Sequence, residues 1–509
     1  MKKLILSASV VASLFAAPTI ESLQKQILEL QKQLEELKAA QQKQNELKKE
    51  IEDLKAKQEK QDDRYYKKVA PIVSNTHLFW SLDLRSSLDY IHQKTTSGAG
   101  YTKVTPNLDG TVTFSDFSQN ITSKKYYNNI LYNRVILTGV YKPSDNLKAT
   151  LKLQVNNMYG MNHSANNSPY NNISWVASET PDDTNVRLKE AFFNYYFGDD
   201  LMFSAGRRPA TNGYPANLRE GDEPNSPLAH LINMEFDGFS FKIGNGEFSK
   251  LSDKFSDYGT WIKFCAGRVY SPSQGKWPMS GAPAYSKDSL KITDFYGVIL
   301  VPYDDGQYSL WTETVWAKNM KGNNFVTQQD AQNAQTGNPF NVKMDDLGDY
   351  FGFNAIIKAS GIGDGINDFL DDTNAFISFA LSKTKPDNGK QMLGSMDDKT
   401  GISIWMGADM PAGEKGRFGF NVVKGSKYWR SMTYGEDTLA GSIAAIRGKA
   451  YDVYYIREII PNLSASLRAK MLDYDYAGSD AFFGIGGDPN AQVFVEKATD
   501  VRAYIRYKF

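Results

Sequence analysis

The chain has 509 residues with 58 basic and 58 acidic side chains, so its formal net charge is zero. This balance removes any general argument for nucleic acid or an anionic surface as a partner. The length exceeds one ordinary globular core, and the 29 Tyr, 28 Phe and 40 Gly favour strands and turns over helical bundles. A single cysteine, Cys265, excludes an internal disulfide and a cysteine-based metal site, so we expect it to be a small packed residue.

The first 17 residues predict a secretory signal peptide. Lys2 and Lys3 precede an apolar run from Leu4 to Phe15, which is too short to span a membrane. No later stretch approaches the roughly 18 consecutive apolar residues of a transmembrane helix. We therefore expect a mature protein that leaves the cytoplasm and is not a helical membrane protein.

Residues 18–64 predict a coiled coil, followed by a linker at 65–77. Aliphatic residues recur at steps of three and four, which is the spacing of an a/d seam, and they resume after a stammer. A bare seam needs a partner helix, so we expect a homo-oligomer through this coil, with the choice between two and three strands open. The seam residues are Ile20, Leu23, Ile27, Leu30, Leu34, Leu37, Leu47, Ile51 and Leu54.

From residue 78 to residue 509 the pattern changes to short segments with alternating polarity. Residues 147–156 are the clearest case, with Leu, Ala and Val on one parity and Lys, Thr and Gln on the other. We expect about 16 such strands, with 14–18 as the range. The connections between them alternate between long loops and tight turns, which is typical of an up-and-down antiparallel β-barrel across an outer membrane.

The last nine residues have one apolar and one charged face, which fits a closing strand between lipid and a watery interior. Because lipid does not tolerate an open sheet edge, the strand near 78–90 should pair with this last strand.

Two segments resemble a known class. The hairpin at 187–211, RLKEAFFNYYFGDDLMFSAGRRPAT, is similar to hairpins of Gram-negative porins, and Phe509 resembles the terminal aromatic residue that the barrel-assembly machinery recognises. With the signal peptide and the coil, the chain resembles a porin-like family of largely unassigned function. The resemblance implies an outer-membrane protein in contact with lipid, with its coil in the periplasm and the assembly machinery as a partner.

Charged residues on the inward parity are the informative residues of the barrel. A charge on the lipid face costs about 2–4 kcal/mol near the midplane, so these side chains should face water. One interpretation is a pore that favours anions; the other is that these charges pair with each other and with acidic loops, leaving little selectivity. The candidates are Arg85, Arg134, Lys148, Lys152, Arg208, Lys263, Lys358, Arg417, Arg468, Lys470, Arg502 and Arg506.

The loop at 209–230 is the candidate for an inward constriction loop. It follows Arg208 and carries Glu220, Asp222 and Glu223.

No catalytic or nucleotide-binding motif is recognisable, and the four His residues have no second ligand at metal spacing, so we expect no metal and no cofactor. His163, Ser164 and Asn166 have the residue types of a lipase triad, but adjacent residues on a strand point to opposite faces. A polar outer loop is the preferred interpretation of this segment.

The leading hypothesis is a porin for passive diffusion of small hydrophilic solutes, without catalysis. The alternative is a structural tether, in which the coil links a plugged barrel to peptidoglycan. An outer-membrane hydrolase ranks third. A plugged lumen would favour the tether over the porin.

Overall fold

The structure is a computed structural model, and it describes residues 77–97, 103–106, 112–115, 122–159, 186–225, 227–252, 254–276, 284–287, 290–336, 338–363, 365–491 and 494–509. The predicted signal peptide, the coil seam and the segment with His163, Ser164 and Asn166 lie outside the described residues. Their assignments stay predictions.

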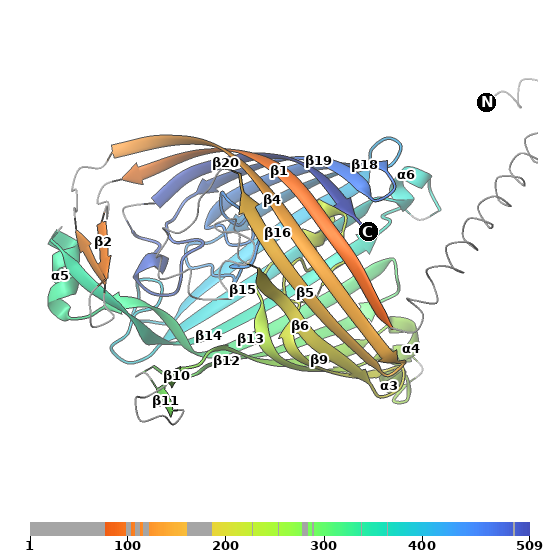
Figure 1. Cartoon of the computed structure of the whole chain (residues 1–509), viewed down its shortest axis with the longest axis horizontal. Coiled ribbons are helices and arrows are strands. Elements are labelled where there is room, and N and C mark those ends of the chain that lie inside the picture. Colours follow the sequence, from red (N-terminus) through yellow and green to blue (C-terminus); the bar gives the residue numbers. More distant parts are fainter. Residues whose placement is uncertain are drawn as a thin grey trace, which may run out of the picture. The chain divides into compact units, whose positions relative to one another are not determined.

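The described chain forms a closed antiparallel barrel of 16 strands (Figure 1). Consecutive wall strands pair with each other, and β1 pairs with β20 to close the ring. The predicted barrel of about 16 strands is thereby confirmed. The wall strands are β1 (Leu78–Ser97), β4 (Thr122–Ser144), β5 (Leu147–Met158), β6 (Arg187–Tyr196), β7 (Leu201–Arg208), β8 (Phe236–Ile243), β9 (Trp261–Tyr270), β12 (Thr293–Asp304), β13 (Tyr308–Phe325), β14 (Phe340–Ser360), β15 (Asn374–Pro386), β16 (Lys399–Pro411), β17 (Gly416–Gly425), β18 (Gly448–Ile460), β19 (Leu463–Tyr474) and β20 (Phe494–Lys508).

Long loops lie at one end of the barrel and short turns at the other, as the sequence predicts. In Figure 1 the loop end is on the left and the turn end, with the C-terminus, is on the right. The long loops contain β2 (Lys103–Pro106), β3 (Val112–Ser115), β10 (Ser273–Lys276), β11 (Ala284–Lys287), α5 (Gln328–Thr336), η1 (Ala216–Glu220) and η2 (Ile485–Gly487). The turn end carries α3 (Asn245–Ser249), α4 (Lys254–Tyr258) and α6 (Asp368–Asp371). None of the helices in the described ranges is long and apolar enough to cross a membrane.

The two faces of the wall differ in polarity, as strand β1 shows. Leu84 and Leu88 are 38% and 42% exposed on the outer face, whereas Arg85 and Asp89 are 1% and 0% exposed on the inner face. Period-two alternation thus places aliphatic side chains toward lipid and charged ones toward the lumen.

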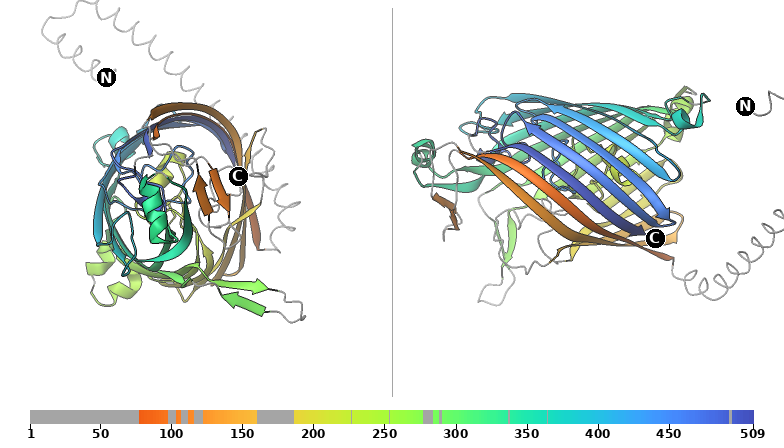
Figure 2. Two further views of the ribbon diagram at one scale, coloured as in Figure 1. Left: turned by 90° about the vertical axis from the view of Figure 1, so that its left-hand side faces the viewer. Right: turned by 90° about the horizontal axis from the view of Figure 1, so that it is seen from above.

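Three segments fold into the lumen, and we call them the first (209–225 and 227–235), second (426–447) and third (475–491) inner loops. Seen from the loop end, chain segments lie inside the ring of strands (Figure 2, left). The first and second inner loops pack apolar side chains such as Leu228 and Ile443 against inward residues of the wall such as Trp405. These three side chains are at most 2% exposed. Part of the lumen is therefore a packed core.

Gly206 on β7 marks a position where the wall requires glycine. Its φ is +125°, and an added Cβ would lie 2.2 Å from the carbonyl oxygen of Ala191 on β6. Both the backbone conformation and the close approach of β6 exclude a side chain there.

We expect Gly206→Ala to destabilise the barrel by about 1–3 kcal/mol, because alanine is strained at this φ. The heat-modifiable mobility of the folded barrel in gels measures this as a lower unfolding temperature. Gly297→Ala on β12 is the control, since its Cβ would meet nothing closer than 3.6 Å. Equal unfolding temperatures for the two variants would contradict the prediction.

Candidate functional site

The strand register places three arginines side by side on the inner wall. Arg85 on β1 lies directly opposite Arg134 on β4 and directly opposite Arg506 on β20. We call these three residues the arginine row. Like charges directly opposite each other destabilise a sheet, so the row requires counter-charges.

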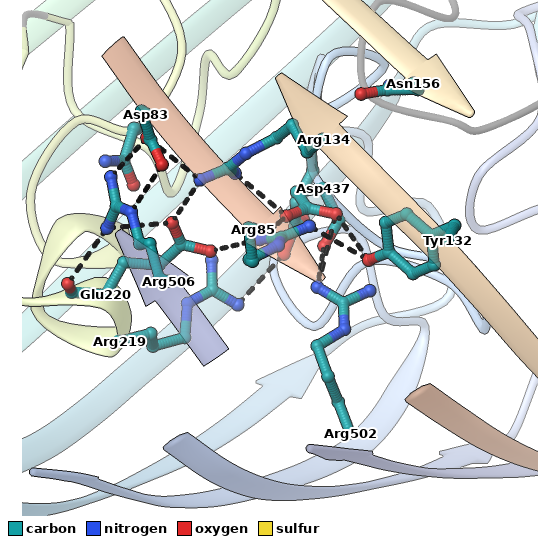
Figure 3. Close-up of polar contacts among 12 residues, drawn as sticks. Asp83, Arg85, Tyr132, Arg134, Asn156, Arg219, Glu220, Asp437, Arg502 and Arg506 are labelled. Carbon is teal, nitrogen blue, oxygen red and sulfur yellow. Dashed lines mark hydrogen bonds and ion pairs between the residues drawn. The ribbon is translucent and has the colours of Figure 1, made fainter. Parts of the chain in front are cut away.

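Two inner loops supply carboxylates to the arginine row (Figure 3). Glu220, the last residue of η1, places Oε1 2.6 Å from Nη1 of Arg85 and Oε2 2.8 Å from Nη2 of Arg134. The same Oε2 lies 3.3 Å from Nη1 of Arg506. Asp437 of the second inner loop pairs with Arg85, and its Oδ2 lies 3.1 Å from Nη1 of Arg134. Two carboxylates from separate loops thus meet on one row.

Two further carboxylates come from β1 itself. Asp83 accepts hydrogen bonds from Nε and Nη2 of Arg506 at 2.8 and 2.6 Å. Asp89 accepts from Nε and Nη2 of Arg502 at 2.9 and 2.8 Å, and Arg502 also lies 3.2 Å from Asp437. These four carboxylates balance the four arginines, and Asp222, which also contacts Arg506, is balanced by Lys508.

The loop carboxylates remain ionised at neutral pH. Burial alone would raise the pKa of Glu220, but Arg134, Arg85 and Arg506 outweigh it and hold that pKa well below its ordinary value. Burial alone would also raise the pKa of Asp437. Arg502, Arg85 and Arg134 outweigh this effect, so the pKa of Asp437 is well below its ordinary value. A carboxyl group with a lowered folded-state pKa stabilises the fold above its unfolded pKa and loses this effect only in stronger acid. Both loops thus stay attached to the wall at physiological pH.

His230 of the first inner loop anchors this loop to the opposite part of the wall. Its Nδ1 and Nε2 each lie 2.9 Å from a serine hydroxyl, of Ser378 on β15 and of Ser403 on β16. Ser378 donates to Asn354, 2.8 Å away, so it accepts from Nδ1–H of His230 and leaves Nε2 as the acceptor for Ser403. His230 is therefore a fully buried residue of the first inner loop.

The inner loops are bonded to each other as well as to the wall. Ile232 and Met432 form a parallel bridge, and Arg219 lies 3.0 Å from Glu436. Arg447 of the second loop donates from Nη1 to two carbonyl oxygens, of Ala477 and Gly487 in the third loop, each at 2.8 Å. The three loops form one connected insert.

Two cavities lie beside this insert. One of about 260 Å³ lies between the first and second inner loops and the wall of β1, β4 and β20. The other, of about 720 Å³, opens at the turn end and is lined by residues such as Lys358 and Arg417. Glu220, Asp222 and Glu223 line both cavities, so the two cavities lie along the same acidic segment of the first inner loop.

The predicted constriction-loop residues contact the wall to different degrees. Glu220 joins the arginine row as described. Asp222 lies 3.0 Å from Arg506 and 2.8 Å from Lys508, whereas Glu223 is exposed in the cavities. That the loop restricts passage of solutes stays a prediction.

The predicted pore-lining residues divide into groups. Arg85, Arg134, Arg502 and Arg506 meet at the cluster, and Lys358 and Arg417 line the turn-end cavity. The remaining residues lie elsewhere on β5, β7, β9 and β19; they are Lys148, Lys152, Arg208, Lys263, Arg468 and Lys470. In this group Lys152 pairs with Glu190 at 2.6 Å, Arg468 with Asp452 at 2.5 Å, and Lys470 lies 3.9 Å from Asp500.

Asp89 and Asp437 are two members of the cluster that the sequence analysis missed. Asp89 shares the inward parity of β1 with Arg85, so the alternation itself could have identified it. Asp437 is one of many loop acids, and no signal in the sequence singles it out.

The C-terminal residue is held to the first strand. Leu82 donates to the carbonyl oxygen of Phe509 at 3.0 Å, and Phe509 donates back at 3.1 Å. Its role as an insertion signal stays a prediction.

Within the described ranges, no group of three or more His, Cys, Asp or Glu residues is arranged to hold a metal ion.

Comparisons with known proteins give a family and several structural similarities. A family model described as "Protein of unknown function (DUF3373)" matches residues 124–509, about three quarters of the chain. No curated protein sequence matches the chain.

Among solved structures, an anion-selective porin from Comamonas acidovorans is 13% identical with a TM-score of 0.43, over 85% of this chain and 99% of that one. OprB of Pseudomonas putida is 12% identical with a TM-score of 0.44, over 87% and 97%. OmpT, an outer membrane protein of Vibrio cholerae, is 12% identical with a TM-score of 0.42, over 85% and 97%. The barrel assignment rests on the strand pairing of this chain itself.

We expect the titration of His230 to lower the stability of the folded barrel as the pH falls from about 6.5 toward 3. Burial lowers the pKa of His230 to about 3, so between this value and about 6.5 the unfolded chain binds a proton that the folded one does not. At pH 5 the loss amounts to about 2 kcal/mol relative to pH 7. The difference in unfolding temperature between the two pH values, compared between wild type and His230→Gln, measures it.

His230→Gln should reduce this pH dependence, because glutamine does not titrate. His92→Gln is the control, since His92 stacks on Tyr127 at the outer face, away from the inner loops. Identical pH profiles for wild type and His230→Gln would show that His230 is not the titrating group.

Proposed function

The chain belongs to the DUF3373 family, and we propose that it is a narrow outer-membrane porin for passive diffusion of small hydrophilic solutes, without catalysis. The observation that carries the proposal is the pair of polar cavities along the first inner loop, one against the wall of β1, β4 and β20 and one at the turn end. We propose that these cavities join into a narrow polar passage. A barrel of 16 strands is wide enough for an aqueous channel, but here the inner loops occupy part of it. Small solutes fit such a passage.

Ion selectivity follows from the balance of charge at the cluster. The wall alone would favour anions, because Arg85, Arg134, Arg502 and Arg506 converge there. Glu220 and Asp437 from the loops, with Asp83 and Asp89 from β1, neutralise these four guanidinium groups. We propose a weak anion preference that the loop carboxylates hold in check.

The second candidate is the structural tether with a plugged barrel. It is favoured by the packed core between the inner loops and the wall, where Trp405, Trp429 and Phe483 are at most 1% exposed. In either case we propose a periplasmic coil at 18–64 that forms the homo-oligomer, with peptidoglycan as a further partner in the tether and the barrel-assembly machinery acting on Phe509. An outer-membrane hydrolase remains the third candidate, and no described residues support it.

Planar-bilayer recordings of the purified full-length chain test the porin proposal. Wild type should give small, steady conductance with a reversal potential in a KCl gradient close to that of a weakly anion-preferring pore. Glu220→Gln with Asp437→Asn removes both loop charges from the arginine row, so the reversal potential should move clearly toward chloride.

Glu247→Gln with Glu414→Gln is the matched control, because it removes two carboxylates at the turn end away from the cluster. Its selectivity should equal that of wild type. No conductance from a folded, heat-modifiable barrel would overturn the porin proposal and place the tether first.

A further inference from the structure

A row of basic residues lies on the outer face of the wall near the loop end. It crosses β17, β18, β19, β20, β1 and β4, and we call it the basic rim. Each member lies within the last few residues of its strand at the loop end, and one acid interrupts the row. The rim consists of Lys424, Lys449, Asp473, Lys497, Lys94 and Lys125.

The strand register places like charges of the rim directly opposite each other. Lys424 faces Lys449, and Lys94 faces both Lys497 and Lys125. Such pairs destabilise a sheet unless an anion lies between them. This is the same electrostatic problem as that of the arginine row, but on the other face of the wall.

Acidic side chains neutralise only part of the positive charge of the rim. Asp473 lies 3.5 Å from Lys497, and Glu496 pairs with Lys94. In the part of the chain that the structure describes, Lys424 and Lys449 have no ion pair, and both are exposed. The rim therefore keeps an excess of positive charge that faces outward.

Another part of the ring shows a self-neutralised alternative. On the outer face of β7, β8, β9 and β12, the cross-strand row reads Arg207, Asp237, Arg268, Asp294, with alternating charge. Arg268 holds Asp294 with hydrogen bonds of 2.8 and 3.2 Å. One cross-strand row of this wall therefore alternates between basic and acidic residues, whereas the basic rim does not.

The position of the rim along the barrel indicates which layer of the membrane surrounds it. Moving toward the turn end on the same outer face, the next side chains are apolar: Tyr451 on β18 and Met471 on β19 are 46% and 57% exposed. Long loops of outer-membrane barrels face the outside of the cell, so the rim stands at the upper border of the apolar band. This is the level of the lipid headgroups in the outer leaflet.

We propose that the basic rim binds the phosphate groups of anionic lipids in the outer leaflet. Directly opposite residues have Cβ atoms about 5 Å apart. The oxygens of one phosphate group can therefore accept hydrogen bonds from two ammonium groups, such as those of Lys424 and Lys449. Lipid, not a soluble ion, is the occupant because these side chains project from the lipid-facing parity. The proposal does not depend on whether the barrel conducts.

Thermal unfolding of the full chain in lipid vesicles tests this proposal. The probes are vesicles of phosphatidylcholine alone and vesicles of phosphatidylcholine with an equal part of phosphatidylglycerol. The anionic lipid should raise the unfolding temperature of wild type. Lys424→Gln with Lys449→Gln should lose most of this upward shift, yet be at least as stable as wild type in phosphatidylcholine alone, because the repulsion between the pair is gone.

Two further variants sharpen the test. Lys449→Glu creates an ion pair with Lys424, so it should raise stability in phosphatidylcholine and weaken the effect of the anionic lipid. Lys142→Gln with Lys250→Gln is the matched control, since both lysines are exposed at the turn end, and it should keep the full shift.

Three results would overturn the proposal. The first is equal stability of wild type in both vesicles, and the second is a full shift in Lys424→Gln with Lys449→Gln. The third is an equal shift from inorganic phosphate added to phosphatidylcholine vesicles, which would assign the rim to a soluble anion instead of a lipid.

Discussion

The repulsion among three arginines on one cross-strand row is the constraint on which the interior of this barrel depends. Arg134, Arg85 and Arg506 are fixed side by side by strand pairing and cannot move apart. Glu220 and Asp437 relieve the repulsion only if their loops enter the lumen. The position of the first and second inner loops, and the proposed passage beside them, follow from this requirement.

The two sides of the insert are held by different forces. Toward β1, β4 and β20 the insert makes ion pairs in addition to apolar contacts, whereas toward β14 to β18 it packs apolar side chains around Trp405. His230 adds hydrogen bonds to β15 and β16 on this second side. Apolar packing excludes water, while a charged surface retains it at its border. The smaller cavity therefore lies on the side with the ion pairs, whereas the turn-end cavity also reaches Lys358 on β14 and Arg417 on β17.

The sequence predicted the wall well because its signals are local. Alternation within each strand and the parity of loop length require no knowledge of distant contacts, and they identified the barrel and its strand number. The arrangement of the cluster could not be predicted, since it depends on register: nothing local shows that Arg85 faces Arg134 and Arg506. The first inner loop was identified from its acids, but Asp437 was missed because loop acids that pair inside look like those that face solvent.

For the proposed porin function, it matters that the counter-charges of the arginine row are covalently attached carboxylates and not mobile anions. Had the arginine row been neutralised by ions from solution, each passing anion would have met a strong binding site and left it slowly. Glu220 and Asp437 occupy that site permanently, because their depressed pKa values keep them ionised over the physiological range. The passage that we propose would stay hydrated without holding anions tightly, and this combination suits fast diffusion of small polar solutes with little regard to charge.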